Sequence, residues 1–323
     1  MISPKVYVFA LTAITLLGSV GILYLHRSAV SRPAATDAPA PQSSLFGLSP
    51  LISFLKIPAA AGSPAVPVPQ KKLVPPSNLT EFFDGFSGVG TIREAGNEDE
   101  SSSLYWWVNS GGYFLVKNGT AETYHGALPP GARFYVRDAV FGLDTDQGAR
   151  PQNLFRLVTR TKWKNLDESL YFKIDSLDLN QSPNRNESNG VLLFSRYVDE
   201  NNLYYMGLRV DGAAVIKKKS NGVYHELAYG QVYPGVYDKN LSPNLLPLHK
   251  WIGIRSVVRN NSDGSVDLQL YIDKDRSGDW TLLLEAKDTG AQGGHALAAK
   301  ASAGIRTDFM DASFDQYAVK EVK

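Results

Sequence analysis

Residues 190–228 read GVLLFSRYVDENNLYYMGLRVDGAAVIKKKSNGVYHELA. Runs of apolar, β-branched and aromatic residues alternate with three short turns, which read DENN at 199–202, DG at 211–212 and SNG at 220–222. Asp-Gly and Asn-Gly between such runs are strong hairpin signals, because tight hairpin turns need positive φ angles. This stretch therefore predicts an antiparallel meander of four strands.

The same pattern of short β runs and turns extends from residue 78 to 323. Residues 104–108 and 113–117 flank a turn at 109–112, so we expect them to form a further hairpin. No long amphipathic helix interrupts the pattern, and the predicted fold class is an all-β, two-sheet antiparallel jelly-roll sandwich. Outside the meander, strands are expected at residues 82–86, 104–108, 113–117, 132–141, 153–161, 169–174, 251–258, 266–272, 280–285, 303–306 and 313–319.

Alternation within the strands separates an inward from an outward face. The inward sets are apolar and include Tyr204, Met206, Leu208, Val210, Ile252, Ile254, Val258, Val266, Leu268, Leu270 and Ile272. The outward sets carry aromatic rings, which stack on sugar C–H faces, and arginines, which bond sugar hydroxyls. An ordinary solvated sheet face remains the alternative. The residues expected to bind carbohydrate are Trp107, Tyr205, Arg209, Trp251, Arg255 and Tyr271.

The N-terminal residues predict a membrane segment. Residues 6–25 read VYVFALTAITLLGSVGILYL and carry no charge, and a helix of this length spans a bilayer at about 1.5 Å per residue. No good cleavage site follows at once, which favours an uncleaved anchor over a cleaved signal peptide for residues 1–27. The expected location is the cell membrane, single-pass, with the β domain outside the cell, or secretion if the segment is cleaved.

A linker joins this segment to the β domain. Residues 28–77 are rich in Pro, Ala and Ser, and such a segment cannot bury enough apolar surface to fold alone. Within it, residues 45–57 read LFGLSPLISFLKI. This apolar segment is either a short helix on the domain or membrane surface, or a strand donated to a neighbouring subunit. The domain itself is expected to cover residues 78–323.

Composition restricts the function. A formal net charge of +1 gives no electrostatic footprint for nucleic acid. The chain has no cysteine, so its stability comes from its core and not from disulfides. The acceptor pattern Asn-x-Ser/Thr, which predicts a glycoprotein if the host glycosylates, occurs at Asn78, Asn118, Asn180, Asn186, Asn240 and Asn260.

Three further stretches carry a resemblance: EFFDGFSG at 81–88, WWVNSGGYFLVKNG at 106–119 and GIRTDFMDASFDQYAV at 304–319. Together with the meander, they resemble the concanavalin A-like lectin/glucanase superfamily. Within it, they are most similar to laminin-G-like and family 16 glycoside hydrolase-like domains. The resemblance implies a jelly roll. The superfamily holds lectins, glycosidases, polysaccharide lyases and adhesion modules, and the fold alone does not choose among them.

Catalytic motifs of such enzymes are not found in the sequence. Family 16-like glucanases resemble one another in carrying a strand motif of the form Glu-x-Asp-x-x-Glu. This chain has no such motif. Asp175 and Asp178 are three residues apart, so they point to opposite faces of a strand. No Gln-x-His lyase motif occurs, and the five histidines form no cluster. We therefore expect a membrane-anchored, lectin-like domain that binds a polysaccharide or cell-envelope glycan. A hydrolase or lyase of the same fold, or a structural or adhesive cell-surface subunit, are the alternatives.

Two places suggest a structural calcium ion. The stretch DKDRSGD at 273–279 sets Asp273, Asp275 and Ser277 at alternate positions, with Asp279 after Gly278, like the first half of a calcium loop. The glutamate expected at the twelfth position is missing, so an acidic hairpin turn is the alternative. The resemblance implies a second site, with Asp315 on the last strand and a carbonyl from Gly112.

The lysine run at 217–219 ends one strand of the meander. It is expected to be a solvated edge that discourages aggregation. Contact with an anionic polysaccharide is the alternative.

Overall fold

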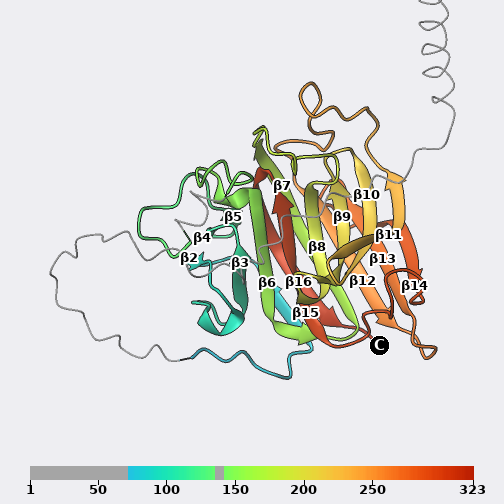
Figure 1. Cartoon of the computed structure of the whole chain (residues 1–323). Coiled ribbons are helices and arrows are strands. Elements are labelled where there is room, and N and C mark those ends of the chain that lie inside the picture. Colours follow the sequence, from blue (N-terminus) through green and yellow to red (C-terminus); the bar gives the residue numbers. More distant parts are fainter. Residues whose placement is uncertain (1–71, 135–141) are drawn as a thin grey trace, which may run out of the picture. The chain divides into compact units, whose positions relative to one another are not determined.

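The computed structural model describes residues 72–134 and 142–323 (Figure 1). The predicted anchor at 6–25, the apolar segment at 45–57 and most of the strand expected at 132–141 lie outside the described residues. Within the described ranges, no helix is long and apolar enough to cross a membrane. Regular structure there is almost entirely β, with two short 3-10 helices, η2 (Glu98–Glu100) and η3 (Pro151–Asn153).

One sheet has nine antiparallel strands. They are β1 (Glu81–Asp84), β2 (Val89–Arg93), β4 (Tyr113–Lys117), β5 (Ala121–Thr123), β7 (Leu166–Leu177), β12 (Ile252–Asn260), β13 (Val266–Asp273), β14 (Thr281–Asp288) and β16 (Met310–Glu321). Their spatial order is β14-β13-β12-β7-β16-β5-β4-β2, and β1 pairs with β16.

The other sheet has seven antiparallel strands. They are β3 (Trp106–Ser110), β6 (Leu154–Trp163), β8 (Gly190–Asp199), β9 (Asn202–Arg209), β10 (Ala213–Ser220), β11 (Val223–Gln231) and β15 (Ala301–Asp308). Their order is β11-β10-β9-β8-β15-β6-β3. The predicted meander is confirmed as β8 to β11, and the turn before β11 has positive φ angles at Asn221 and Gly222, as the sequence signal requires.

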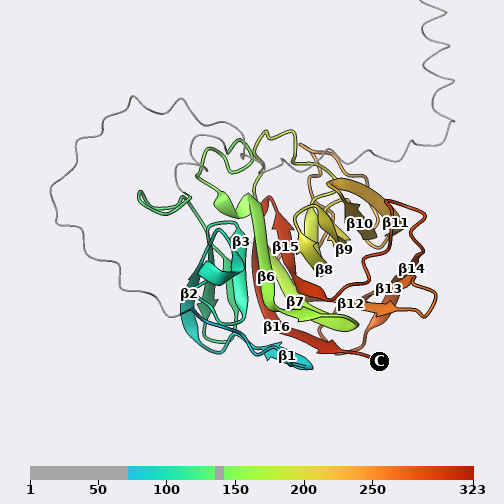
Figure 2. The same cartoon turned by 60° about the horizontal axis from the view of Figure 1, so that its bottom comes forward.

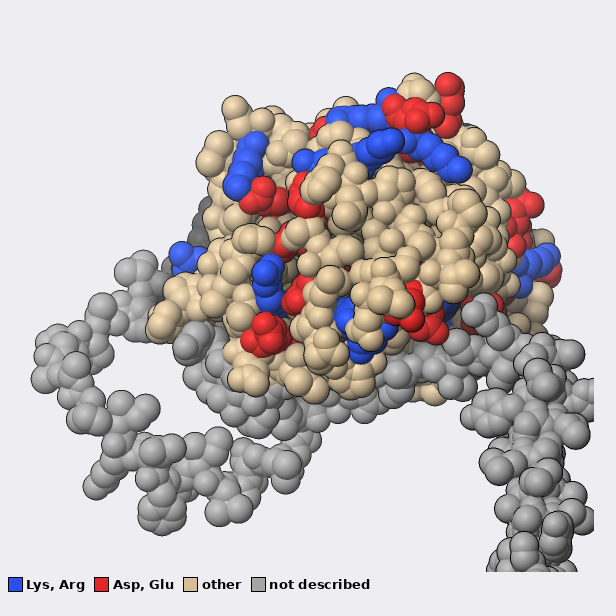
Figure 3. All heavy atoms as spheres, turned by 90° about the horizontal axis from the view of Figure 1, so that it is seen from above, with Lys and Arg blue, Asp and Glu red and all other residues tan. Residues whose placement is uncertain are grey.

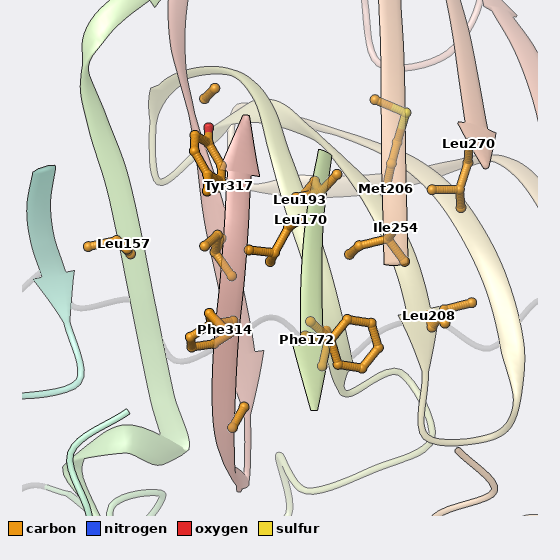
Figure 4. Packing of buried hydrophobic residues seen from close by; sticks show 14 of the residues in the cluster. Leu157, Leu170, Phe172, Leu193, Met206, Leu208, Ile254, Leu270, Phe314 and Tyr317 are labelled. Carbon is orange, nitrogen blue, oxygen red and sulfur yellow. The ribbon is translucent and has the colours of Figure 1, made fainter. Parts of the chain in front are cut away.

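The two sheets pack face to face around one apolar core. Figure 4 shows Leu157 and Leu193 from the seven-stranded sheet and Phe172 and Phe314 from the nine-stranded sheet in the space between the layers. All four side chains are fully buried, and burial of each stabilises the fold by roughly 1.5–3 kcal/mol. The inward sets predicted from alternation all belong to this core. The two-sheet sandwich expected from the sequence is therefore confirmed.

The hairpin predicted around residues 109–112 is wrong. β3 pairs with β6 in the seven-stranded sheet, whereas β4 pairs with β2 and β5 in the nine-stranded sheet. The turn thus carries the chain from one layer to the other. Gly111 has a φ of 104° and lies so close to Phe155 that an added Cβ would be 2.8 Å from its ring. A glycine turn between two β runs indicates a reversal, but it does not tell whether the runs pair.

The carboxyl group of Glu168 is buried between the sheets. Glu168 of β7 has no exposed surface and accepts hydrogen bonds from the Tyr317 hydroxyl (2.8 Å) and the Gly304 backbone N–H (3.0 Å). The Ser195 and Ser256 hydroxyls lie 3.4 Å away. Burial raises the pKa of Glu168 to about 8. Because its partners come from both sheets, this group ties the two layers together.

The solvated edge predicted for residues 217–219 is also wrong. β10 lies between β9 and β11, and each of the three lysines is at most 6% exposed. Lys218 points into the sandwich, where its ammonium lies 2.9 Å from the Asp288 carboxylate, and the Tyr204 hydroxyl donates to the same carboxylate (2.7 Å). A single strand therefore directs one lysine inward as a buried ion pair and its neighbours outward.

Candidate functional site

The six residues predicted to bind carbohydrate lie on two different surfaces. Trp107, Tyr205 and Arg209 belong to β3 and β9 of the seven-stranded sheet. The other three lie in or directly before β12 and β13 of the nine-stranded sheet. Since each set faces away from the shared core, the two sets point in opposite directions. The structure therefore divides the six between two faces: Trp107, Tyr205 and Arg209 on one, and Trp251, Arg255 and Tyr271 on the other. Among them, only Arg255 and Tyr271 lie in direct contact.

The outer face of the seven-stranded sheet carries its own aromatic cluster. The Tyr205 ring lies 5.3 Å from Phe194 and 5.7 Å from Tyr224 between ring centroids. Residues opposite each other in the strand pairs form a continuous row, which stacks side chains on one face. The row is Trp107, Val158, Gly304, Phe194, Tyr205 and Lys217.

An arginine–tyrosine cluster, made of Arg156, Tyr205, Tyr224 and Arg306, lies beside this row. The Arg306 guanidinium donates to the Tyr205 hydroxyl (3.0 Å) and the Tyr224 hydroxyl (3.4 Å), and its Nε donates to Asp308 (2.9 Å). It also lies 5.3 Å from the centroid of the Tyr205 ring. Arg156 is directly opposite Arg306 in the β6–β15 pair. One guanidinium thus holds two phenols on one sheet face.

The electrostatics of this cluster are positive. Burial by itself would raise the pKa of Tyr224, but Arg306 and Lys219 hold it below its ordinary value. Burial raises the pKa of Tyr205 far above its ordinary value and lowers that of Lys219. The lowered pKa of Tyr224 therefore indicates an excess of positive charge around its hydroxyl, which suits anionic or electron-rich ligand groups.

Access to the face differs between its members. Tyr205 is only 3% exposed, whereas Trp107, Arg156, Tyr224 and Arg306 are half-buried. A ligand would therefore meet the half-buried side chains first. Sequence reasoning missed Arg156, Tyr224 and Arg306. Alternation around Ile305 could have indicated that Arg306 points outward, but no sequence signal places it between two tyrosines from β9 and β11.

The second group lies on the nine-stranded sheet. The Arg255 guanidinium donates twice to the Asp167 carboxylate, at 2.7 Å each, and lies 5.1 Å from the centroid of the Tyr271 ring. The hydrogen bond to Asp167 raises the pKa of Arg255. Trp251 lies elsewhere on this face, with the Arg276 guanidinium 4.9 Å from its ring. A charged or aromatic neighbour thus holds each of these side chains in its orientation.

The predicted calcium loop is closed by hydrogen bonds. Asp273 is 1% exposed, and its carboxylate accepts from the Tyr171 hydroxyl (2.8 Å) and the backbone N–H groups of Gly278 (2.7 Å), Ser277 (3.1 Å) and Asp275 (3.2 Å). Burial opposes ionisation, but these bonds hold the pKa of Asp273 below its ordinary value. The contacts fit a hydrogen-bonded acidic turn and not a cage of oxygen ligands around calcium.

Asp315, the other residue expected at a calcium site, forms an ion pair with Arg276. Among the residues that the structure describes, no group of three or more His, Cys, Asp or Glu side chains could hold a metal ion. Calcium binding thus stays a prediction that chelation would test.

The surface charge seen from above is mixed. Figure 3 shows the lysine and arginine side chains of this view next to aspartate and glutamate, without one large single-sign field. This agrees with the formal net charge of +1.

Comparison with models of known protein families gives no match, and comparison with curated proteins gives none. Among solved structures, the chain is similar to the carbohydrate-binding module CBM66 from Bacillus subtilis, with 11% identity, a TM-score of 0.38, and coverage of 54% of this chain and 85% of that one. It is also similar to a prokaryotic beta-1,3-1,4-glucanase (lichenase) from a mouse hindgut metagenome, with 11% identity, a TM-score of 0.40, and coverage of 76% and 100%.

A third similar structure is the exoplasmic/lumenal domain of VIP36 in its Ca2+/Man-bound form, with 7% identity, a TM-score of 0.39, and coverage of 75% of this chain and 92% of that one. At TM-scores below 0.5, the function has to be argued from this chain's own residues.

Proposed function

We propose that the β domain binds carbohydrate without cleaving it, through the outer face of the seven-stranded sheet. The observation that supports this most is the arginine–tyrosine cluster. Its guanidinium and phenol groups offer donors and acceptors for sugar hydroxyls, and Trp107 offers a ring for a sugar C–H face. The ligand is a polysaccharide outside the cell or a glycan of the cell envelope, and the predicted anchor at residues 6–25 would hold the domain at the outer side of the membrane.

The carboxylates near the cluster favour binding over hydrolysis. Glycosidases use two carboxyl groups, one of which must be free to exchange a proton with the glycosidic oxygen. Asp308 is 2% exposed and accepts two hydrogen bonds from Arg306 Nε, at 2.9 and 3.0 Å. Glu200 lies 3.5 Å from the Arg156 guanidinium. Each of these carboxylates is thus engaged by an arginine.

A second candidate function is cleavage of an acidic polysaccharide by β-elimination, and Tyr224 favours it. A phenolate at Tyr224 would take the proton from the carbon next to a uronate carboxylate, while Arg306 binds that carboxylate. The electron pair then forms a C=C bond as the bond to the leaving sugar oxygen breaks, and that oxygen takes up a proton. The products are an unsaturated uronate and a shortened chain.

The test is calorimetric titration of the full chain with neutral and acidic polysaccharides, together with an assay for unsaturated products. Saturable binding without such products supports binding alone, and we expect Arg156→Gln and Trp107→Ala each to weaken it about tenfold, or ~1.4 kcal/mol. Val89→Ala, which truncates an 83% exposed side chain on β2, is the matched control. Unsaturated products that disappear in Tyr224→Phe would support the second candidate. No binding to any glycan would refute both.

A further inference from the structure

The nine-stranded sheet carries a second row of outward side chains. Residues opposite each other in successive strand pairs are Phe83 on β1, Ala318 on β16, Ser169 on β7 and Arg255 on β12. Figure 2 shows these four strands on the lower side of the molecule. Two small residues in the middle of the row leave room above the sheet, between a phenyl ring at one end and a guanidinium at the other.

This room is a hollow of about 580 Å3, which we call the β1 hollow. Its volume falls within the range of roughly 300–1,000 Å3 that is usual for ligand sites. The hollow is lined by Leu79, Glu81, Phe82, Phe83, Tyr105, Asp167, Ser169, Arg255, Trp280, Ala318, Val319 and Lys320.

Aromatic rings form part of the lining at both ends of the row. Phe83 is 65% exposed, so its ring is open to a ligand. Trp280 lies over Gly253 of β12, where an added Cβ would be 2.8 Å from the indole ring. The absence of a side chain at Gly253 therefore lets the ring lie against the sheet, and Tyr171 supports it at 5.7 Å between centroids.

Charged groups in the lining balance each other. The Arg255–Asp167 pair fixes one cation and one carboxylate, and the Lys320 ammonium lies 3.7 Å from the same carboxylate. Glu81 is opposite Lys320 in the β1–β16 pair. Two cations thus meet two carboxylates, so the lining favours a neutral polar ligand over an ion, and its fixed donors and acceptors suit pairs of hydroxyl groups.

We propose that the β1 hollow is a second saccharide site, for a short neutral oligosaccharide that lies across the strands with its sugar faces on Phe83 and Trp280. From β1 to β12 the row crosses three strand spacings, about 14 Å in all. The site lies on the sheet opposite the arginine–tyrosine cluster and does not depend on that cluster binding any ligand. The domain would thus contact carbohydrate on two sides.

The test is titration of the full chain with laminaritriose and cellotriose. Calorimetry and the fluorescence of the tryptophans measure the binding. We expect saturable binding that Phe83→Ala and Trp280→Ala each weaken about tenfold, with thermal unfolding unchanged for the exposed Phe83. Val89→Ala is the matched control for loss of an exposed apolar side chain, and Arg156→Gln reports on the other face.

Binding that survives both hollow variants would overturn the proposal, as would no binding of either trisaccharide. Equal loss in Arg156→Gln would place the trisaccharide on the other sheet and overturn the proposal too. If Arg156→Gln and Trp107→Ala do not weaken the binding of a polysaccharide, only the proposal for the arginine–tyrosine cluster is refuted. The two proposals therefore fail separately.

Discussion

The outer faces of the two sheets are built from the same residue types but present them differently. On the seven-stranded sheet, Tyr205 is 3% exposed and shares the Arg306 guanidinium with Tyr224. On the nine-stranded sheet, the small residues between Phe83 and Arg255 leave the β1 hollow, and Phe83 is 65% exposed. The two faces thus share residue types, and the size of the neighbours across the strands decides whether a face is hollowed.

The first prediction compares an inward-facing lysine with an outward-facing lysine on the same strand. Lys218→Ala leaves the buried Asp288 carboxylate without its ion-pair partner, and we expect a loss of about 3–5 kcal/mol in the free energy of unfolding. Lys219→Ala, one residue along on the outer face, is the comparison and should cost much less. Urea unfolding measures both. Similar losses would contradict the assignment of Lys218 as the inward-facing member of the run.

The second prediction concerns the carboxyl group that ties the layers together. The pKa of Glu168 is raised from 4.5 to about 8, so the folded state keeps a proton that the unfolded state releases. Its stabilising effect is complete below pH 4.5 and is lost as the pH rises through 8, on the order of several kcal/mol. Glu168→Gln stays neutral and should flatten this dependence in unfolding experiments from pH 5 to 9. If the free energy of unfolding changes with pH in the same way in both proteins, the raised pKa of Glu168 is contradicted.

The third prediction concerns the turn next to the β1 hollow. Asp273 accepts a hydrogen bond from Tyr171, which in turn packs against Trp280. Asp273→Ala leaves three backbone N–H groups and this hydroxyl without their acceptor, and we expect a loss of about 1–3 kcal/mol. Adding a calcium chelator to the unaltered chain should leave its thermal midpoint unchanged. A lower midpoint on chelation, restored by calcium, would instead support the calcium site predicted from the sequence.

The smallest expected effect tests the independence of the faces. Trp107→Ala and Trp280→Ala each should weaken binding only on their own sheet, by about 1–1.5 kcal/mol. In the double variant, the two losses in the free energy of unfolding should add within about 0.5 kcal/mol, because the two tryptophans share no partner. Calorimetry with a polysaccharide and a trisaccharide measures each site. A coupling larger than this would mean that the two faces act as one site.

The sequence predicted the sheets better than the sites. Period-two alternation identified the inward residues of β9, β12 and β13, because burial of one face imposes that period directly. The same alternation identified Tyr205 and Arg255 as outward. It could not tell which sheet each belongs to, since strand order depends on pairing between segments far apart in the chain. For the same reason it could not foresee Phe83 and Ser169 as neighbours across β16.

Local signals also missed contacts that depend on longer-range packing. Two glycines at 111 and 112 indicated a reversal between β3 and β4, but these strands ended in different sheets. The alternate acidic residues from Asp273 indicated metal ligands, which stays a prediction, but they gave no sign that Tyr171 and backbone N–H groups donate to the first carboxylate. In both cases the missing information is which atoms from other strands come close.

The position of β16 has a consequence for how the chain is made. This strand, Met310–Glu321, is the last in the sequence, yet it pairs with β7 on one side and with β5 and β1 on the other. Until it emerges from the ribosome, β7 and β5 have open edges in the middle of their sheet, where unpaired strands invite contact with other chains. The nine-stranded sheet can therefore close only after β16 has been made, and a nascent chain that stops before Met310 leaves these edges exposed.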